Sequence, residues 1–445
     1  MSPGHLQGLA RRSGFMKRRS KLDPALFVDT LVFTSLDHRQ LSLQDCCNDL
    51  AQYHDRSVSK VALHKRFNGQ SVSLLKLVLA DLIVGALPDA ADRMPDCPFG
   101  RILVSDSTKF SLPAHYADQY PGYGGCRGTG SLMNIQYGLD IKNGAWERLE
   151  LTKAVRNDQT HSRESVQDIQ KGDLLVRDLG YVTKKYLEGV AAAQAYFVNR
   201  LPPKWSVYTT DGAALLDWKK LYRDMERIRT GRHEQKVGIP LDGRVVEVRL
   251  VAVHVPRAVW EERIRKAAKH AKSKGAGVSD EYRIRCRFNV FITNAAEGQL
   301  DAQGIINLYR MRWQIELMFR AWKSLLALNR VKAVKTARME SMLLAKFIWI
   351  LINWKIFCSL NAAIREQSPE YACSMWKFFK SARNFSHSLR GQITNGLQNF
   401  RQWCTSFIVP IVKNLTIEPK KDKEAAYELL DAISSRLWKQ QKTLG

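Results

Sequence analysis

The 445-residue sequence lacks the cysteine spacing and the long uncharged apolar runs that mark several classes of protein. Its eight cysteines include no C-x-x-C pair, and the adjacent Cys46 and Cys47 cannot make a zinc site alone. We therefore expect free thiols in a reducing cytoplasm and no structural zinc. The basic N-terminus lacks the apolar core of a signal peptide. The apolar stretch 343–360 carries Lys346 and Lys355, so we expect a buried helix and no membrane partner.

Acidic residues are also scarce. The chain has 43 Asp and Glu against 69 Lys and Arg, which gives a net charge of +26. A compact fold with this excess repels itself unless a polyanion offsets the charge, so nucleic acid is the first candidate partner and an acidic membrane surface the second. Hydrophobic residues make up 45% of the chain, enough for ordinary cores, and the length indicates two to four domains.

The N-terminal hundred residues have a helical pattern. Ser42 and Asp45 are typical of a helix start, and a polar break at 55–57 precedes a second, basic helix. Two short helices with a basic second one suggest a helix-turn-helix, although a plain helical hairpin has the same pattern. In the DNA-binding interpretation, the contacts come from Lys60, Lys65 and Arg66.

From Arg101 onward the pattern predicts an α/β fold. We expect strands at 101–113, in a hairpin around Lys142–Gly144, at 172–183 with Asp178 near its C-terminal end, and at 195–201. After Pro202 the rhythm changes. Two long alternating strands are predicted at 244–255 and 282–293, with a basic helix or loop at 259–275 between them.

The stretch 308–328 predicts one helix with a buried back and a polar front. At about 100° per residue, its large polar side chains fall within an arc of roughly 80°; they are Tyr309, Arg312, Glu316, Arg320 and Lys323. A solvated face with i,i+4 ion pairs is one interpretation. The other is a row that follows DNA phosphates, in which Glu316 holds a divalent cation that the phosphates also need.

Two further carboxylates support the second interpretation. Asp106 and Asp178 stand at the ends of apolar strands, although each taken alone is more often a capping or ion-pairing residue. Together with Glu316 they would form an oxygen-rich pocket suited to Mg²⁺ or Mn²⁺ rather than zinc. Two such ions could activate an attacking oxygen and stabilise the leaving one. The neighbouring Asp140 and Asp173 are expected to be structural.

At these residues the chain resembles a known family. Its Tyr309-x2-Arg312-x3-Glu316-x6-Lys323 spacing is similar to the Y-x2-R-x3-E-x6-K signature of DDE transposases of bacterial insertion sequences, in the cut-and-paste branch. "VSDST" and "RDLGY" resemble the strands that carry the first and second aspartates of that family. The resemblance implies a catalytic, metal-binding triad of Asp106, Asp178 and Glu316 with two Mg²⁺ per active site, Mn²⁺ being accepted. It assigns Tyr309, Arg312 and Lys323 to the DNA phosphates, with Arg320 in the same row and Arg200 as a further DNA contact.

The resemblance also implies an RNase H-like catalytic core with a β-rich insertion. With the patterns above it predicts the following units: an N-terminal helical DNA-binding domain (1–98), the first part of the core (99–201), the insertion (202–296), the last part of the core with the catalytic helix (297–365) and a C-terminal helical region (366–445).

The function implied is that of a transposase in the bacterial cytoplasm, bound to nucleoid DNA. It would bind the terminal inverted repeats of its own insertion sequence as a homodimer, cleave them through a hairpin intermediate and join them to target DNA. One position departs from the family: Asn289 stands where relatives place a base-stacking tryptophan, with Phe288 beside it. The alternatives are a catalytically inactive DNA-binding regulator with the same fold and a stand-alone nuclease.

Overall fold

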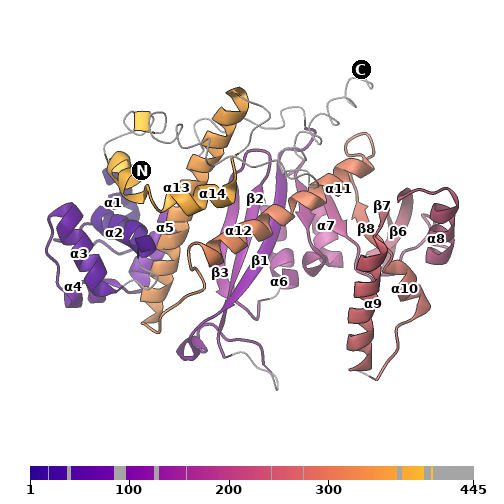
Figure 1. The fold of residues 1–445 in the computed structure, drawn as a ribbon, viewed down its shortest axis with the longest axis horizontal. Helices are drawn as coiled ribbons and strands as arrows, with labels where there is room; N and C mark the ends of the chain where they lie inside the picture. Colours follow the sequence, from indigo (N-terminus) through magenta and orange to yellow (C-terminus); the bar gives the residue numbers. More distant parts are fainter. Residues whose placement is uncertain are drawn as a thin grey trace.

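One eight-stranded sheet forms the centre of the protein (Figure 1). The computed structural model describes residues 1–403 apart from 19, 38–41, 85–96, 125–129, 157, 242, 274, 368–372 and 395–401. The strand order is β3-β2-β1-β4-β5-β8-β7-β6. The strands are β1 (Ile102–Ser111), β2 (Leu132–Asp140), β3 (Trp146–Lys153), β4 (Leu174–Arg177), β5 (Tyr196–Arg200), β6 (Arg232–Leu241), β7 (Arg244–His254) and β8 (Phe288–Thr293).

The three central strands are parallel and the outer strands are antiparallel. β4 pairs in parallel with β1 on one side and with β5 on the other. The remaining pairings are antiparallel, as expected for the predicted hairpin of β2 and β3, whose turn contains Gly144 at φ +73°. β5 joins β8 through only three residue pairs, whereas ten pairs join β6 to β7. The sheet is therefore continuous, with narrow seams of three or four residue pairs at β1–β4, β4–β5 and β5–β8.

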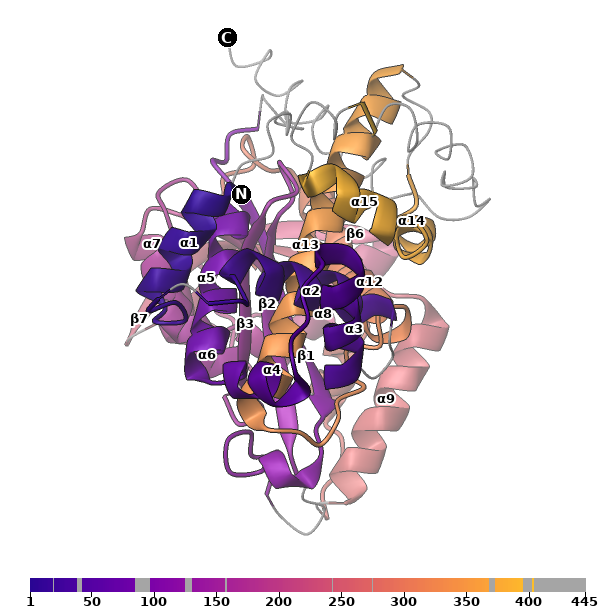
Figure 2. The same cartoon turned by 90° about the vertical axis from the view of Figure 1, so that its left-hand side faces the viewer.

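Helices cover the faces of the sheet and also lie beyond its two edges. α1 to α5 pack as a bundle around the long α13, as the view from that side shows (Figure 2). α11 lies against β4 and β5, and α12 against β1. The helices are α1 (Pro3–Arg12), α2 (Pro24–Asp37), α3 (Leu43–His54), α4 (Lys60–Arg66), α5 (Gly69–Val84), α6 (Asp158–Glu164), α7 (Lys184–Ala192), α8 (Trp218–Arg227), α9 (Arg257–Lys272), α10 (Asp280–Arg285), α11 (Ala302–Met311), α12 (Trp313–Ser324), α13 (Thr336–Gln367), α14 (Met375–Ala382) and α15 (Ser386–Thr394).

α13 contains the apolar stretch that the sequence predicts to be a buried helix. It is long and apolar enough to cross a membrane by composition, but 83% of its most apolar window is buried inside the protein. Trp322 of α12 is 1% exposed and packs edge-on against Tyr137 of β2 and Phe347 of α13. This cluster of rings fixes α12 between the sheet and the long helix.

Two strand predictions need correction or completion. Residues 282–285, predicted as the start of a strand, belong instead to α10 (Asp280–Arg285), because Ser279 caps the amide of Tyr282 and starts a helix. Only Phe288–Thr293 is extended. The basic segment after β7 is a helix, α9, and β6 pairs with β7 although no strand was predicted there. The amphipathic helix predicted near 424–442 lies outside the described residues.

Candidate active site

Strand register brings Asp106 and Asp178 together. Ser105 of β1 pairs in parallel with Arg177 of β4, so the next residues of the two strands, Asp106 and Asp178, are neighbours across the ladder. Asp178 follows β4 directly and begins the short 3₁₀ turn η3 (Leu179–Tyr181). Asp106 lies in the middle of β1 rather than at its end, but the parallel pairing with β4 stops just before it. Both side chains leave the sheet where the central pairing ends.

Alternation along the strands puts both aspartates on the face that α11 and α12 cover. Val104 of β1 and Val176 of β4 pack into the cluster beneath α12 and α13, whereas Leu175 packs into the cluster on the opposite face. Because side chains alternate between faces, residues two positions further along point to the same side as the valines. The sheet therefore presents Asp106 and Asp178 to the helices that carry Tyr309 and Glu316.

The predicted single helix at 308–328 is two helices that meet at Arg312. α11 ends at Met311 and α12 begins at Trp313, so the prediction of one uninterrupted helix was wrong. Arg312 keeps helical dihedral angles (φ −53°, ψ −32°), but the amide of Ile315 donates to its carbonyl three residues back. This tighter hydrogen bond interrupts the regular ladder at the junction of the two helices. The polar side chains remain on one face across the junction.

Arg312 and Tyr309 bind all three candidate carboxylates. Arg312 donates from one guanidinium nitrogen to Asp106 Oδ2 (2.5 Å) and from the other to Glu316 Oε1 (2.7 Å). The Tyr309 hydroxyl donates to Asp178 Oδ1 at 2.5 Å. The side chains of Arg312 and Asp106 are only 11% and 17% exposed. Asp106, Asp178 and Glu316 are thus gathered around one arginine and one phenol in a largely buried place.

The surroundings shift the two aspartates in opposite directions. Burial raises the pKa of Asp106 to about 6, although Arg312 and the Ser107 amide lower it, and the nearby charges of Asp178 and Glu316 raise it further. Burial also disfavours the charged form of Asp178, but the Tyr309 hydroxyl and the Arg312 guanidinium outweigh it, so the pKa of Asp178 lies below its ordinary value. Neighbouring carboxyls whose pKa values are shifted in opposite directions are typical of functional sites.

The other residues of the predicted row differ in their surroundings. Lys323 donates to the carbonyl of Lys109 (2.9 Å) and so ties α12 to β1, and burial lowers the pKa of its ammonium group. Arg320 is exposed. Arg200, at the end of β5, donates to Asn289 Oδ1 at 3.3 Å. Its charge is close enough to Asp178 to help lower the pKa of that carboxyl.

Phe288 is a core residue. It is 3% exposed and packs near the rings of Trp218, Tyr222 and His254. It therefore cannot stack on a nucleobase without leaving that core. Asn289 is half-buried, and its Oδ1 accepts hydrogen bonds from Arg200 and from Arg263 of α9 (2.6 Å).

The N-terminal contacts predicted for DNA fall into two groups. Ser42 and Asp45 form a capping box at the start of α3, as predicted, and Ser59 caps α4. Lys60 and Lys65 are exposed on α4.

Arg66 instead faces the protein. It donates to the carbonyl of Phe15 and to the Ser20 hydroxyl, and its guanidinium lies over the Phe15 ring. Two of the three proposed contacts thus face solvent, while Arg66 holds α4 against the segment between α1 and α2.

Sequence reasoning missed a polar network behind the aspartates. Asp158 of α6 accepts hydrogen bonds from Ser107 (2.8 Å) and from Gln136 (3.1 Å), and Tyr181 donates to Gln136 (2.8 Å). Ser107 follows Asp106, and Tyr181 belongs to the turn that Asp178 begins. The polar run "SDST" could have indicated this network, but its partners come from distant segments. The network holds the two aspartate-bearing segments from the opposite face of the sheet.

The prediction that Asp140 and Asp173 are structural agrees with their contacts. Asp140 accepts from the amides of Ile102 and Lys142, and Asp173 binds the Arg101 guanidinium.

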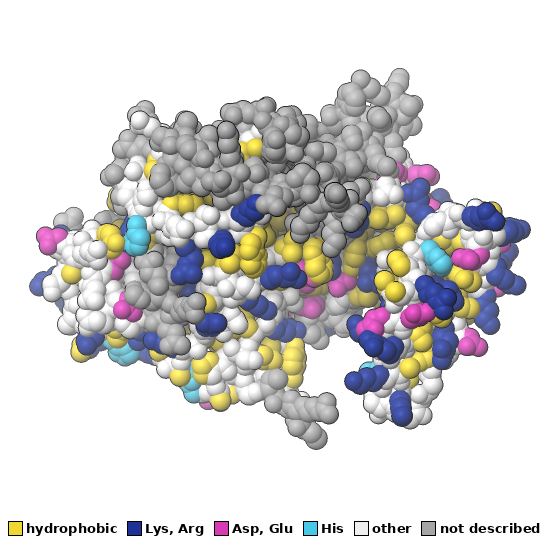
Figure 3. Space-filling view, viewed as in Figure 1, with side chains coloured by type: hydrophobic (Ala, Val, Ile, Leu, Met, Phe, Trp, Pro, Cys, Tyr) yellow, Lys and Arg dark blue, Asp and Glu magenta, His cyan; other side chains and the backbone are white. Residues whose placement is uncertain are grey.

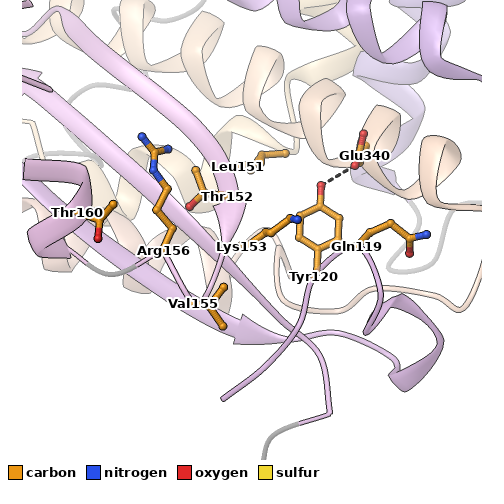
Figure 4. Close-up of a pocket in the computed structure, with 9 residues that line it drawn as sticks. All are labelled: Gln119, Tyr120, Leu151, Thr152, Lys153, Val155, Arg156, Thr160 and Glu340. Atoms are coloured by element: carbon orange, nitrogen blue, oxygen red, sulfur yellow. Dashed lines mark hydrogen bonds between the residues drawn. The ribbon is translucent and has the colours of Figure 1, made fainter. Parts of the chain in front are cut away.

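A separate pocket of about 600 Å³ lies beside β3 (Figure 4), and the hydrogen bond from Tyr120 to Glu340 stands at its edge. None of the candidate site residues lines it.

The sequence matches the family model of the transposase DDE domain over residues 98–352. That match covers more than half of the chain and includes every carboxylate of the site. The chain belongs to the DDE transposase family. The transposase is 28% identical over 367 residues to the transposase for insertion sequence element IS231B of Bacillus thuringiensis subsp. berliner, covering 79% of this chain and 77% of the relative.

Two other relatives align over nearly the whole length. The transposase for IS231D of Bacillus thuringiensis subsp. finitimus is 26% identical over 460 residues, covering 99% of this chain and 96% of its own. The transposase for IS1151 of Clostridium perfringens is 23% identical over 441 residues, covering 96% and 93%. The resemblance drawn from the sequence is thereby confirmed at the level of the family.

Domains of this family use divalent metal ions, and the donors present in this transposase suit such an ion. Carboxylate oxygens are the preferred ligands of hard divalent cations. The place between Asp106 and Glu316 already takes a positive charge, that of the Arg312 guanidinium. Among the residues that the structure describes, however, no three His, Cys, Asp or Glu side chains lie close enough to hold one ion together. The donor chemistry fits a divalent ion, while Arg312 and Tyr309 now bind the donor oxygens.

Proposed function

We propose that this transposase binds the ends of its own insertion sequence and catalyses metal-dependent cleavage and strand transfer of DNA. The observation that carries the proposal is the gathering of Asp106, Asp178 and Glu316 around Arg312 and Tyr309. The structure describes a mixed α/β protein with one eight-stranded sheet, and the proposal interprets its central strands as an RNase H-like core. The units at 1–98, 99–201, 202–296, 297–365 and 366–445 belong to the same proposal.

Asp106, Asp178 and Glu316 would hold two divalent ions, Mg²⁺ or Mn²⁺, which when bound would activate the attacking oxygen and offset charge on the scissile phosphate. The protein's own contribution is position and charge. Tyr309, Arg312 and Lys323 would hold phosphates of the DNA end, with Arg200 and Arg320 further along the backbone. In each step an oxygen attacks phosphorus in line with the oxygen that leaves, so no covalent enzyme intermediate is needed.

The proposed reaction sequence is cut and paste. Water first releases a 3′ hydroxyl at the element's end, that hydroxyl attacks the opposite strand to close a hairpin, and a second water opens it before joining to target DNA. The active form is a homodimer on two ends, acting on nucleoid DNA in the cytoplasm. Because Phe288 is buried in the core, any base stacking during hairpin formation requires a different residue.

Cleavage of end-containing duplex DNA by Glu316→Gln, with Glu297→Gln as the control, tests the proposal. Glu297 is an exposed glutamate just before α11, so its change alters net charge equally without touching the site. We expect Glu316→Gln to keep end binding and to lose cleavage by several orders of magnitude. The reason is that an NH2 group, which does not bind the ion, replaces one carboxylate oxygen and the negative charge is lost. Denaturing gels would also show the hairpin product as a strand of doubled length.

Three results would contradict the proposal. Wild-type cleavage by Glu316→Gln would refute the carboxylate assignment. Specific end binding without any cleavage by the unmodified protein, in Mg²⁺ or Mn²⁺, would instead indicate a catalytically inactive regulator. Cleavage without preference for the element's ends would indicate a stand-alone nuclease.

A further inference from the structure

α9 is a helix without a buried face. None of its 16 residues is buried, and in Figure 1 it extends away from the sheet beside the outer strands. Its attachment lies on one side. Trp260 Nε1 donates to the carbonyl of Arg283, and the guanidinium of Arg287 lies 4.1 Å from the Trp260 ring centroid. Helices of folded proteins usually bury one apolar stripe, so a helix held only along one edge points to a role for its open faces.

The charge of α9 is strongly unbalanced. Its two acidic residues, Glu261 and Glu262, are engaged in ion pairs with Arg257, Arg265 and Lys266 of the same helix. The last turns carry two more cations, Lys269 and Lys272, both exposed and without an ion-pair partner among the described residues. A solvated face usually mixes the two signs, whereas here the basic residues exceed the acidic ones by a wide margin.

A chain of polar contacts connects the base of α9 to the candidate active site. Arg263 donates to the carbonyls of Cys286 and Phe288 and to Asn289 Oδ1. The same Asn289 oxygen accepts from Arg200, whose charge acts on Asp178. Asn289 thus holds two guanidinium groups close together although they repel each other. Burial lowers the pKa of Arg263, and the nearby charge of Arg200 lowers it further. A row of basic side chains therefore runs from Arg200, beside the carboxylates, through Arg263 to the last turns of α9.

The space-filling view shows a hollow between α9 and the body of the protein (Figure 3). Lys and Arg side chains, with a few acidic ones among them, gather on the α9 side of this hollow, and further acidic side chains are visible on the body near its upper end. α9 has 16 residues, so it is about 24 Å long, which equals the rise of about seven base pairs of duplex DNA. The length and the charge both match the backbone of a DNA duplex.

We propose that α9 is a phosphate-binding arm that holds the backbone of the DNA duplex across the hollow from the active site. The proposal rests on the proposed function, because it takes the bound polyanion to be the DNA on which the site acts. Lys269 and Lys272 contact phosphates outside the reach of the Tyr309–Lys323 row. Such contacts add affinity without reading sequence, since phosphates are the same at every base pair.

The test measures how salt weakens binding of the full-length protein to a duplex that contains the element's end. Fluorescence anisotropy would compare wild type with K269Q/K272Q, and with the charge-matched control K184Q/K185Q on exposed positions of α7. Two lost phosphate contacts reduce the slope of log affinity against log salt by about 1.8. Between 50 and 200 mM salt the K269Q/K272Q protein should therefore lose about tenfold less affinity than wild type, while the control keeps the wild-type slope.

Backbone footprinting would locate the lost contacts, and we expect protection to disappear from one small patch of neighbouring phosphates, because Lys269 and Lys272 lie one helical turn apart. An unchanged slope and footprint in K269Q/K272Q, with wild-type end binding and cleavage intact, would refute the arm and leave the proposed function standing. Failure of the wild-type protein to bind or cleave the ends would instead refute the proposed function and the arm with it. Equal losses in K269Q/K272Q and K184Q/K185Q would show a general charge effect and also refute the arm.

Discussion

Replacement of Arg312 by glutamine should destabilise the protein in a way that depends on pH. Arg312 offsets the charge of Asp106 in a largely buried place, at an N–O distance of 2.5 Å. Removal of one partner of a buried ion pair leaves the other charge uncompensated. Asp106 can avoid this uncompensated charge by protonation, however, because burial has already raised its pKa to about 6. Without Arg312 it can take up a proton, and the cost of that proton depends on pH.

The magnitude follows from linkage between protonation and folding. The pKa of Asp106 is raised in the fold above its ordinary value of 3.8, so the stability it contributes is present at low pH and is lost as pH rises from about 4 through 6. At pH 7 the raised pKa of Asp106 lowers the free energy of unfolding by about 3 kcal/mol in wild type. In the variant this loss cannot exceed about 4.4 kcal/mol, which is the free energy needed to protonate an ordinary aspartate at pH 7. The Asp106 contribution to the loss is therefore at most about 1.4 kcal/mol at pH 7. At pH 5 Asp106 is already mostly protonated in wild type, and this contribution falls to nearly zero.

Urea unfolding at pH 5 and pH 7 would measure the effect, with Arg320→Gln as the control because Arg320 is exposed on the same helix and forms no ion pair with a described residue. Packing lost with the guanidinium is independent of pH, so the difference between the two pH values isolates the charge. In an Asp106→Asn background most of this pH dependence should disappear, and any remainder would come from Asp178 and Glu316, which Arg312 also faces. Equal losses at pH 5 and 7 in the native background would show that Arg312 acts through packing alone and would refute the reasoning.

Three further predictions concern single elements of the protein. Lys323→Ala should weaken binding to cleaved ends and lower the salt slope by about 0.9, because one phosphate contact is lost; an unchanged slope would mean that Lys323 serves only to tie α12 to β1. Alanine at both Lys60 and Lys65 should impair end recognition in a gel-shift assay and leave the melting temperature unchanged, since both side chains are exposed; intact recognition would exclude α4 as a reading helix. Phe288→Ala should lower the free energy of unfolding by about 3–5 kcal/mol because it empties a core position; a small loss in stability with a large loss in hairpin formation would contradict its assignment to the core.

The sequence predicts those parts of the fold that local pattern controls. β1, β4, β5 and β7 are runs of apolar or alternating residues, and the start of α3 has the serine and aspartate of a capping box. The order of polar residues on one helical face is also a local property, so helical periodicity alone is enough to group Tyr309, Arg312 and Glu316. The family match covers the segment that contains these residues.

Other features depend on contacts that a single sequence does not contain. The segment 282–285 alternates like a strand, but a serine cap makes it helical. The pairing of Arg312 with Asp106 joins residues 206 positions apart, and it depends on how α12 lies against β1. Asp158 gives no local indication of its role, because Ser107 and Gln136 reach it only after three separate segments have folded. Long-range register, rather than local propensity, determined these contacts.

The narrow seam between β5 and β8 has a mechanical consequence. Three residue pairs are a small share of the hydrogen bonds in the sheet, and local stability follows the density of such contacts. One hydrophobic cluster crosses this seam, from Leu175 and Phe197 to Leu250 and Ile292, so side-chain packing as well as the short ladder ties β6, β7 and β8 to the inner strands. A substitution that empties this cluster would therefore weaken the connection between α9 and the carboxylates on the inner strands without removing a strand pair.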